Sequence, residues 1–574
     1  QTLTLDGGTL MPADLRLVEI AQLRVDEATL TGESNPVDKT AEPVAGDDLP
    51  LGDRVDLAFK GTMVTYGRGV GVVIATGMAT ELGRIARLLR DADEVKTPLQ
   101  QRLDRLGRRL ALVVLGLCAV IFGAGVLRGE PPLLMFMTAL SLAVAAIPEA
   151  LPAVVTVSLA LGARTMARRN ALLNRLPAVE TLGSVTYICA DKTGTLTQNR
   201  MRVEAAFVDR RRVSTGAEIA AAGEAGALLL QAMALSNDAE RASDGSVGGD
   251  PTEVALFVAA AEAGMEKAGL TATLPRMAEL TFSSERARMT TLHRHGDGAI
   301  AFTKGAPEAV VPGCVDALGP TGPVPIDSAG VLAVAAEMAH DGLRVLAMAM
   351  RRFDHLPADP SPSAVETGQT FLGLLGLLDP PRPEARAAVA LCQSAGIRVV
   401  MVTGDHPATA AAIARTLGIS APGDPIVTGA VLAAQPAEEF AAHVRDVRVY
   451  ARVAPGQKIQ IVEALQQHGE FVAMTGDGVN DAPALRRADI GVAMGRGGTD
   501  VARQAAHMVL LDDNFATIVS AVAEGRRIYD NIRKFVRYVL TGNSAEIWTL
   551  FLAPLVLLPT PLLPIHILWV NLVT

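Results

Sequence analysis

One aspartate, Asp191, lies where the sequence changes from an apolar run to a small polar loop. Residues 185–190 are mostly β-branched or apolar, which favours a buried strand, and the loop that follows contains Gly194. In open α/β sheets ligands bind outside the carboxyl ends of the strands, so a phosphate could reach this carboxylate. A carboxylate is ionised at neutral pH and can attack phosphorus without a general base. For an isolated aspartate, capping of the loop is the simpler interpretation.

Two further candidate strands also end in loops that carry aspartates. The run 397–402 precedes Thr403-Gly404-Asp405, and the run 471–474 precedes 475–481, which holds Asp477 and Asp481. A phosphoryl group in transfer spreads negative charge over its oxygens, and it needs a metal ion, a cation and hydrogen-bond donors held in place. We therefore expect the three loops to converge on one phosphate.

The residue types in these loops suit the separate roles. Asp477 is predicted to bind Mg²⁺ together with Asp191, because carboxylate oxygens are preferred by hard cations. Lys458 would supply the fixed positive charge, and the alternative is a lysine on a helix surface. The candidate catalytic residues are Asp191, Lys192, Thr193, Thr403, Gly404, Asp405, Lys458, Asn480 and Asp481, and the candidate Mg²⁺ ligands are Asp191, Thr193 and Asp477.

The segment Asp-Lys-Thr-Gly-Thr-Leu-Thr at 191–197 is identical to the phosphorylation signature of the P-type ATPases. The resemblance extends over nearly the whole chain, and the membrane segments look like those of the calcium-pump branch of the type II pumps. It implies that ATP phosphorylates Asp191 in a domain similar to the haloacid dehalogenases. It also favours the catalytic role of Lys458 over the surface role.

Composition limits the class of protein. The 574 residues are enough for several domains, and a hydrophobic content of 49% indicates that part of the chain lies in a membrane. A net charge of −9 gives no basic stripe for nucleic acid. The four cysteines lack CxxC spacing, which predicts reduced thiols rather than a zinc site or disulfides. The chain starts without Met and stops inside an apolar run, so we expect a piece of a longer protein.

The first 80 residues alternate short apolar runs with Gly, Pro and Asp, which predicts a small β-rich domain. Within it, Thr31-Gly32-Glu33-Ser34 presents one carboxylate on a tight turn. Taken alone, this segment is equally compatible with a turn that is only exposed to solvent. Its position ahead of Asp191 resembles the actuator domain of P-type pumps, which implies that Glu33 positions the water that hydrolyses an aspartyl phosphate.

Apolar runs predict membrane helices on both sides of the large central region. Residues 110–127 are uncharged and nearly long enough for the ~30 Å hydrocarbon core, and 133–163 exceed that length. A short turn at 128–132 would join them in a hairpin, and flanking arginines place both of its ends in the cytoplasm. A third helix is expected at 538–558, and a fourth begins near residue 565.

Polar residues inside these runs predict a cation site. Glu149 lies between Pro148 and Pro152, and prolines free backbone carbonyls from helical hydrogen bonds. Such groups are tolerated in a membrane where they line a site, although a protonated structural glutamate is the alternative. Asn543 and Glu546 share one helical face. Resemblance to calcium pumps implies a cation held by Val144, Ala145, Ile147, Glu149, Asn543, Glu546, Asn571 and Thr574. Oxygen donors exclude a soft metal but leave Ca²⁺, Na⁺, K⁺ and Mn²⁺ open, and the resemblance of 569–574 to calcium pumps favours Ca²⁺.

Residues 202–370 are rich in Ala and Gly and interrupt the α/β pattern, so we expect an inserted nucleotide-binding domain. Phe282 could stack on a purine and Lys304 lies on a turn, but phenylalanine is usually core and lysine usually solvated. The family resemblance implies ATP contacts at Glu253, Phe282, Lys304, Arg344 and Arg452. In one departure from the family, a basic residue usual after the Phe is replaced by Ala287, between Arg286 and Arg288.

These inferences predict a multidomain α/β protein with membrane helices. The expected parts are a β-rich actuator domain at 1–80, a linker helix and transmembrane hairpin at 81–171, a haloacid-dehalogenase-like, Rossmannoid phosphorylation domain at 172–201 and 371–531, an inserted α+β nucleotide-binding domain at 202–370, and a truncated transmembrane hairpin at 532–574. The predicted function is ATP-driven cation transport, with Ca²⁺ export favoured, by an integral protein of the plasma membrane with cytoplasmic domains. The alternatives are a membrane-anchored phosphatase and a non-transporting fragment. Intramembrane Glu149, Asn543 and Glu546 argue against a simple anchor.

Overall fold

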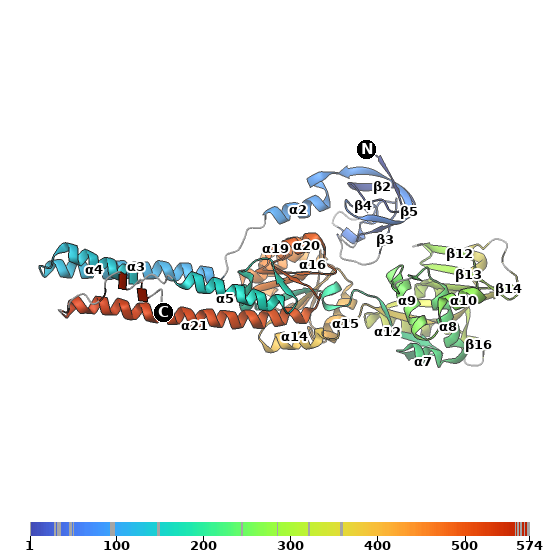
Figure 1. Ribbon diagram of the computed structural model, residues 1–574. Coiled ribbons are helices and arrows are strands. Elements are labelled where there is room, and N and C mark those ends of the chain that lie inside the picture. The colour runs from blue at the N-terminus through green and yellow to red at the C-terminus, as the bar shows by residue number, and fades with distance from the viewer. Residues whose placement is uncertain are drawn as a thin grey trace.

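The computed structural model forms three domains and a long helical stalk (Figure 1). It describes residues 2–27, 30, 36–44, 49, 51–91, 98–145, 150–242, 245–283, 285–319, 322–355, 357, 360–556, 558, 562, 565–566 and 569–570. Glu33, Ile147, Glu149, Asn571 and Thr574, all predicted site residues, lie outside these ranges.

The N-terminal domain is an antiparallel sheet, as the alternating pattern predicts. It contains β1 (Thr2–Asp6), β2 (Asp14–Asp26), β3 (Val37–Asp38), β4 (Leu57–Ala58) and β5 (Met63–Ala75). Leu15, Leu17 and Val25 of β2 are fully buried, so its alternate residues form the core of this domain. The helix α2 (Glu81–Asp91) follows the sheet.

The central domain is an α/β domain with an eight-stranded sheet in the order β20-β21-β19-β7-β22-β23-β24-β6. All neighbours are parallel except β24 and β6. Its strands are β6 (Ala171–Leu173), β7 (Tyr187–Asp191), β19 (Arg398–Val402), β20 (Ile426–Thr428), β21 (Val449–Ala451), β22 (Val472–Gly476), β23 (Ile490–Met494) and β24 (Met508–Leu510). Every residue of β7 is buried because alternate side chains enter two different apolar clusters, one on each face.

Helices cover both faces of this sheet. Those that carry or adjoin the site are α6 (Ala178–Ser184), α14 (Ala385–Ser394), α15 (Pro407–Leu417), α18 (Pro455–Gln467), α19 (Ala482–Arg487) and α20 (Asp500–Ala505). Residues of α6, α14 and α15 pack in the cluster that contains Ile188, and residues of α18 and α19 pack in the cluster that contains Tyr187. The carboxyl edge of β7 is thereby fixed between two helical layers.

The inserted domain has its own nine-stranded sheet. The strands are β8 (Arg202–Val208), β9 (Arg211–Val213), β12 (Arg276–Ser283), β13 (Arg288–His295), β14 (Gly298–Gly305), β15 (Cys314–Gly319), β16 (Gly322–Pro325), β17 (Arg344–Phe353) and β18 (Gln369–Leu378), with α8 (Gly223–Leu235), α9 (Pro251–Glu262) and α12 (Ser328–His340) packed on the sheet. The structure corrects the predicted boundary at residue 370, which falls inside β18. Since β18 pairs with the entry strand β8, residues 371–378 belong to the inserted sheet.

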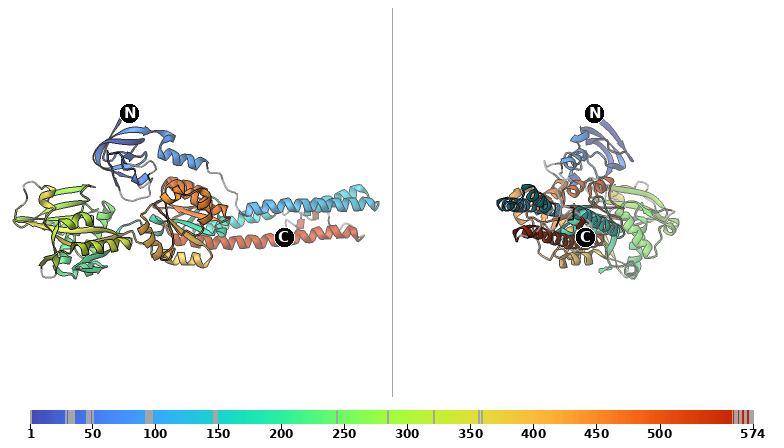
Figure 2. Two further views of the ribbon diagram at one scale, coloured as in Figure 1. Left: turned by 180° about the vertical axis from the view of Figure 1, so that it is seen from behind. Right: turned by 60° about the vertical axis from the view of Figure 1, so that its left-hand side comes forward.

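The stalk consists of α3 (Pro98–Leu127), α4 (Pro132–Ala145), α5 (Ala150–Ala167) and α21 (Phe515–Leu555). Figure 2 shows it projecting away from the three domains, with α3 and α4 folded back on each other. Within the described residues, 107–127 is the one helical stretch long and apolar enough to cross a membrane. The predicted run 133–163 corresponds to α4 and α5, which flank residues 146–149, and the predicted polar and apolar segments after 523 form the single helix α21.

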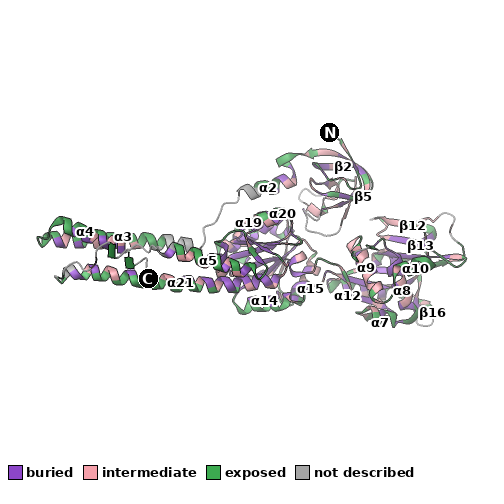
Figure 3. Ribbon diagram, viewed as in Figure 1, coloured by how far each residue is buried: buried purple, intermediate pink, exposed green. Residues whose placement is uncertain are grey.

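The stalk and the domains differ in how far their side chains are buried (Figure 3). The sheets have continuous buried cores, whereas large apolar side chains of the stalk, including Leu112, Leu127 and Leu133, are exposed. A long surface of this kind on a soluble body would be exceptional, and it suits a lipid environment.

Candidate active site

Three neighbouring strands bring the predicted catalytic loops to one edge of the central sheet. Asp191 ends β7, Asp405 follows β19 on one side, and Asp477 follows β22 on the other. Because these strands are parallel, their carboxyl ends lie together, and a ligand at this edge can contact all three loops.

The carboxylate of Asp191 is buried and held on both of its oxygens. The backbone N–H of Lys192 donates to Oδ1 at 2.7 Å, and Nζ of Lys458 lies 3.2 Å from Oδ2. The backbone N–H of Asp191 donates to Oγ1 of Thr475 at 3.0 Å, which ties β7 to β22. The two side-chain contacts and the backbone contact together fix the position of Asp191.

Lys458 is an interior residue of the site rather than a solvated helix residue. Only 3% of its surface is exposed, and its Nζ atom lies 2.5 Å from Oδ1 of Asp481 as well as near Asp191. Burial alone would lower the pKa of Lys458, but the two carboxylates outweigh it and raise the pKa. The ammonium group stays charged at neutral pH.

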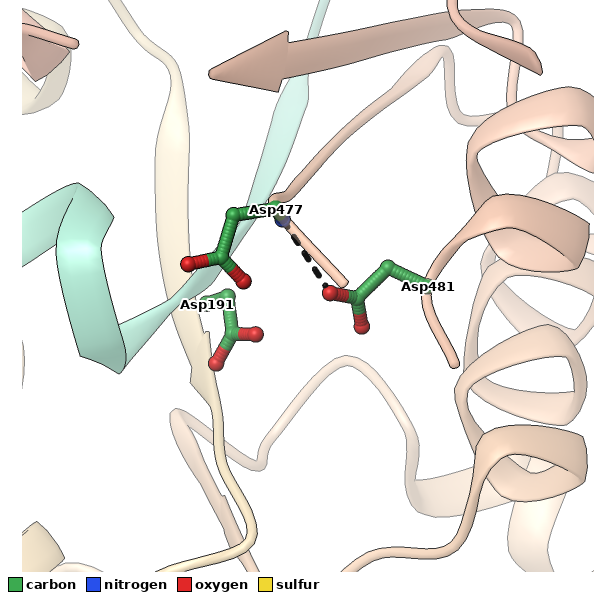
Figure 4. A group of neighbouring side chains, drawn as sticks. All are labelled: Asp191, Asp477 and Asp481. Atoms are coloured by element: carbon green, nitrogen blue, oxygen red, sulfur yellow. Dashed lines mark hydrogen bonds between the residues drawn. The ribbon is translucent and has the colours of Figure 1, made fainter. Parts of the chain in front are cut away.

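Asp481 organises the loop between β22 and α19. Its Oδ2 atom accepts the backbone N–H of Asp477 at 3.2 Å (Figure 4) and the backbone N–H of Gly478 at 3.1 Å. Its Oδ1 atom accepts a hydrogen bond from Lys458. Asp481 therefore holds the backbone of this loop in place and also pairs with Lys458. The side chains of Asp191 and Asp477 lie next to each other, with ligand oxygens within 4.8 Å, and can bind a ligand together.

This pair of carboxylates fits a hard divalent cation. Ligand oxygens of Asp191, Asp477 and Asp481 lie within 4.8 Å of one another. Burial raises the pKa of Asp191 to about 6, and burial together with the neighbouring carboxylates raises the pKa of Asp477 to about 8. Oδ1 of Asn480 is buried without a hydrogen-bond partner in the part of the chain that the structure describes, so it adds an available oxygen. A cation would relieve the repulsion between the carboxylates and supply the missing partner.

Gly194 is required by the approach of Asp477. Its φ is +70°, and a Cβ atom at this position would lie 2.8 Å from Oδ2 of Asp477. The left-handed backbone conformation disfavours any side chain here, and a Cβ atom would also push the carboxylate of Asp477 out of place. Thr193, a predicted ligand, lies in the same loop and is half-buried.

Lys192 and Asp405 form a second ion pair beside the site. Nζ of Lys192 lies 2.7 Å from Oδ2 of Asp405 and 3.9 Å from Oδ2 of Asp379. Burial opposes the charge of Lys192, but these carboxylates raise its pKa overall. The pair joins the loops after β7 and β19. The backbone of Asp405 is held in turn by Thr403, whose Oγ1 accepts its N–H at 3.1 Å, and by the N–H of Arg452 at 3.2 Å.

Two residues of the connection between the domains, Asp379 and Arg382, were not predicted from the sequence. Asp379 accepts a hydrogen bond from Thr197 at 2.5 Å, and Arg382 donates to the carbonyl of Gly194 at 2.9 Å. The signal was present, because Pro380 and Pro381 directly after an apolar strand mark a stiff connection. Asp379 and Arg382 hold the loop after β7 against the strand that leaves the inserted domain.

Comparison with known families assigns the three domains. Residues 1–90 match the P-type ATPase actuator domain, 226–384 match the P-type ATPase cytoplasmic domain N, and 336–486 match haloacid dehalogenase-like hydrolases. The chain is also 46% identical over 578 residues to the calcium-transporting ATPase 1 of Bacillus cereus, a match that covers 99% of this chain and 64% of that protein. The chain belongs to the P-type ATPases. The fold class predicted from the sequence is confirmed.

Other comparisons agree with this membership. The P-type ATPase chain is 45% identical over 596 residues to the cation-transporting ATPase pma1 of Synechocystis, with 99% of this chain and 66% of that protein covered. The chain thus spans less than two thirds of the length of these curated relatives. A zinc-transporting PIB-type ATPase in the E2.Pi state shares the fold, with a TM-score of 0.70 and 23% identity over 99% of this chain and 75% of that one.

The actuator domain of this P-type ATPase docks on the loop that carries Asp477. Val479 packs against an apolar cluster of Leu30, Phe59 and Ile85. Leu30 directly precedes the segment 31–34, which lies outside the described residues. The contact places Leu30 beside the phosphorylation domain.

In the inserted domain, Lys304 and Glu253 form a buried pair. Nζ of Lys304 lies 2.7 Å from Oε1 of Glu253 and 2.5 Å from the carbonyl oxygen of Ser236. Burial lowers the pKa of Lys304, while Glu253 acts against that shift. Phe282 lies on β12 under the guanidinium group of Arg24, 5.2 Å from the ring centroid. The structure places Arg344 elsewhere, in a cavity beside Lys192 and Asp405.

Part of the predicted cation site lies between α4 and α21. Ala145 is fully buried, and Val144 packs in one apolar cluster with Ile547 and Leu550 of α21. Asn543 is 5% exposed, and its Nδ2 atom has no hydrogen-bond partner among the residues that the structure describes. The predicted partners at 147, 149, 571 and 574 are not described, so the structure brings together only the contributions of α4 and α21.

Proposed function

We propose that this chain is part of an ATP-driven cation pump in which Asp191 is phosphorylated. The observation that carries the proposal is the carboxylate of Asp191, which lies beside Lys458 and the neighbouring Asp477 at the carboxyl edge of the sheet. The names of the relatives, a calcium-transporting and a cation-transporting ATPase, support transport as the purpose of the reaction.

In the proposed reaction, a carboxylate oxygen of Asp191 attacks the γ-phosphorus of ATP, an acyl phosphate forms, and ADP leaves. Lys458 stabilises the negative charge on the oxygens in transfer. Mg²⁺, held by Asp191 and Asp477 with an oxygen from the loop of Thr193, would neutralise further charge on the phosphoryl group. The loop of Thr403 and Gly404 and the separate loop of Asn480 supply hydrogen-bond donors.

Hydrolysis of the acyl phosphate is assigned to the actuator domain. Glu33 would orient the water that attacks phosphorus, which releases inorganic phosphate and restores the Asp191 carboxylate. Docking of Leu30 and Phe59 on Val479 supports this assignment, because Leu30 precedes Glu33 by three residues in the sequence and lies beside the phosphorylation loop.

We propose Ca²⁺ as the transported cation and the plasma membrane as the location, with the three domains in the cytoplasm. Asn543 and Glu546 on α21 and Glu149 between α4 and α5 offer oxygen donors, which suit a cation that takes six to eight oxygen ligands. The calcium-transporting relatives support this choice over Na⁺, K⁺ or Mn²⁺. A membrane-anchored phosphatase would have no use for such polar groups in its stalk.

The test uses the protein expressed from its complete coding sequence and reconstituted in lipid vesicles. With γ-labelled ATP, Mg²⁺ and micromolar Ca²⁺ it should form an acid-stable, hydroxylamine-labile phosphoprotein and accumulate Ca²⁺ in the vesicles. Asp191→Asn should abolish both, while Asp446→Asn, a change of an exposed aspartate, should leave both unchanged. Label on Asp191→Asn would overturn the assignment. Labelling that ignores Ca²⁺ and responds to Na⁺, K⁺ or Mn²⁺ would overturn only the choice of ion.

A further inference from the structure

A cavity of about 400 Å³ lies where the inserted domain meets the phosphorylation domain. Lys192, Asp405 and His406 line it from the phosphorylation side, and Arg344 lines it from the start of β17. The cavity therefore connects the phosphorylation loop with the domain expected to bind the nucleotide. A polyphosphate that extends toward Asp191 would need positive charge along this path.

The arginines near Phe282 cannot supply that charge. Arg286 and Arg288 both contact the carboxylate of Glu366, the latter with Nε 2.8 Å from Oε2, and Glu366 is completely buried. Thr290 donates to the same carboxylate at 3.0 Å. Withdrawal of either arginine would leave a buried carboxylate short of partners, which is strongly unfavourable. The residue between the two arginines, Ala287, carries no charge.

Arg200 is the cation that the structure offers instead. It lies in the loop after the phosphorylation motif and lines the cavity together with Arg344. Its backbone N–H donates to Oδ1 of Asp379 at 3.0 Å, which fixes the base of the side chain. Across the described ranges, no Asp or Glu carboxylate lies within ion-pair distance of its guanidinium group. Lys192, in contrast, is already paired with Asp405.

We propose that Arg200 binds the polyphosphate of the nucleotide, and that with Arg344 it takes over the charge that position 287 lacks. A guanidinium group donates two parallel hydrogen bonds to phosphate oxygens, so an arginine without a carboxylate partner at this place is well suited to the task. The inference rests on the proposed function, in which ATP is the substrate. It adds a phosphate-binding residue from the phosphorylation domain, outside the strands around Phe282.

The experiment measures nucleotide binding to the chain by calorimetry, with ATP and adenosine as probes. Arg200→Gln should weaken ATP binding about tenfold, the usual effect of losing a charge-assisted hydrogen bond, and should leave adenosine binding unchanged. Arg202→Gln is the matched control. Arg202 lies two residues further along, on β8, where it pairs with Glu262 at 3.8 Å outside the cavity, so both affinities should be preserved.

The outcomes separate this inference from the proposed function. Failure of the parent chain to bind ATP would overturn the function and the inference together. Equal ATP affinity in the parent and Arg200→Gln would overturn the inference alone, and so would equal losses for ATP and adenosine, since a change of fold would weaken both. Arg200→Lys provides a second check, because a retained charge should restore part of the ATP affinity.

Discussion

The ammonium nitrogen of Lys458 lies 3.2 Å from Oδ2 of Asp191, across 267 residues of sequence. The same nitrogen bonds Asp481, so one cation offsets two buried carboxylates, one at the end of β7 and one in the loop between β22 and α19. This arrangement fixes the position of the nucleophile. It also matters for the stability of the domain, because removal of one charge leaves its buried partners uncompensated.

Lys458→Met should destabilise the phosphorylation domain by about 3–5 kcal/mol, the usual cost of breaking a buried ion pair. Asp191 and Asp481 would be left without their cation. Thermal unfolding monitored by circular dichroism measures the loss, with Lys534→Met, at an exposed lysine of α21, as the control. Lys458→Met combined with Asp481→Asn should recover part of the stability. An unchanged melting temperature in the single variant would contradict the importance of the pair.

Stability without Mg²⁺ should fall as the pH rises from about 4 to about 8. The pKa of Asp477 is raised from 3.8 to about 8, so in this window the folded state binds more protons than the unfolded state. Ionisation at higher pH then opposes folding. Melting temperatures in the presence of a chelator should show this decline, and Mg²⁺ should reverse it at pH 8. Asp477→Asn should flatten the profile, and a profile of the same slope in this variant would refute the role of Asp477.

Gly525→Ala should weaken the junction between the stalk and the phosphorylation domain. A Cβ atom at Gly525 of α21 would lie 2.7 Å from the backbone nitrogen of Gly183 and 2.8 Å from the carbonyl oxygen of Val179 in α6. Overpacking of this kind costs about 1–3 kcal/mol. Gly542 is the matched control on the same helix, because nothing lies within 4 Å of a Cβ atom there. In thermal unfolding, Gly542→Ala should have a higher melting temperature than Gly525→Ala. The reverse order would disprove the close approach of α21 to α6.

Glu33→Gln should form the phosphoprotein normally and lose the label at least about 100-fold more slowly, because a carboxylate that orients or activates water contributes on this scale. The complete protein is labelled from ATP and chased with unlabelled ATP. Glu42→Gln, at an exposed glutamate of the same domain, should decay at the parent rate. Parent-like decay in Glu33→Gln would remove the actuator domain from the hydrolysis step.

The sequence by itself determined the local features of this protein. Continuous apolar runs predicted β7, β19 and β22, because strands buried on both faces carry no polar alternation. The loops after these strands identified Asp191, Asp405 and Asp477 as one set of site residues, since parallel strands end at the same edge of a sheet. The two separate apolar stretches before residue 171 and after residue 538 likewise predicted the stalk.

Only the tertiary structure decided which of the charged groups are available. Arg286 and Arg288 flank Ala287 in the sequence, but only the structure shows that both pair with the buried Glu366, about 80 residues away. Pairing with β8 assigned β18 to the inserted sheet. A hydrogen bond from the backbone N–H of Arg200 to Asp379 holds Arg200 at the cavity. Local propensity and spacing carry no information about such partners. Burial at long sequence separation selects them, since a buried charge is tolerated only where folding brings it an opposite one.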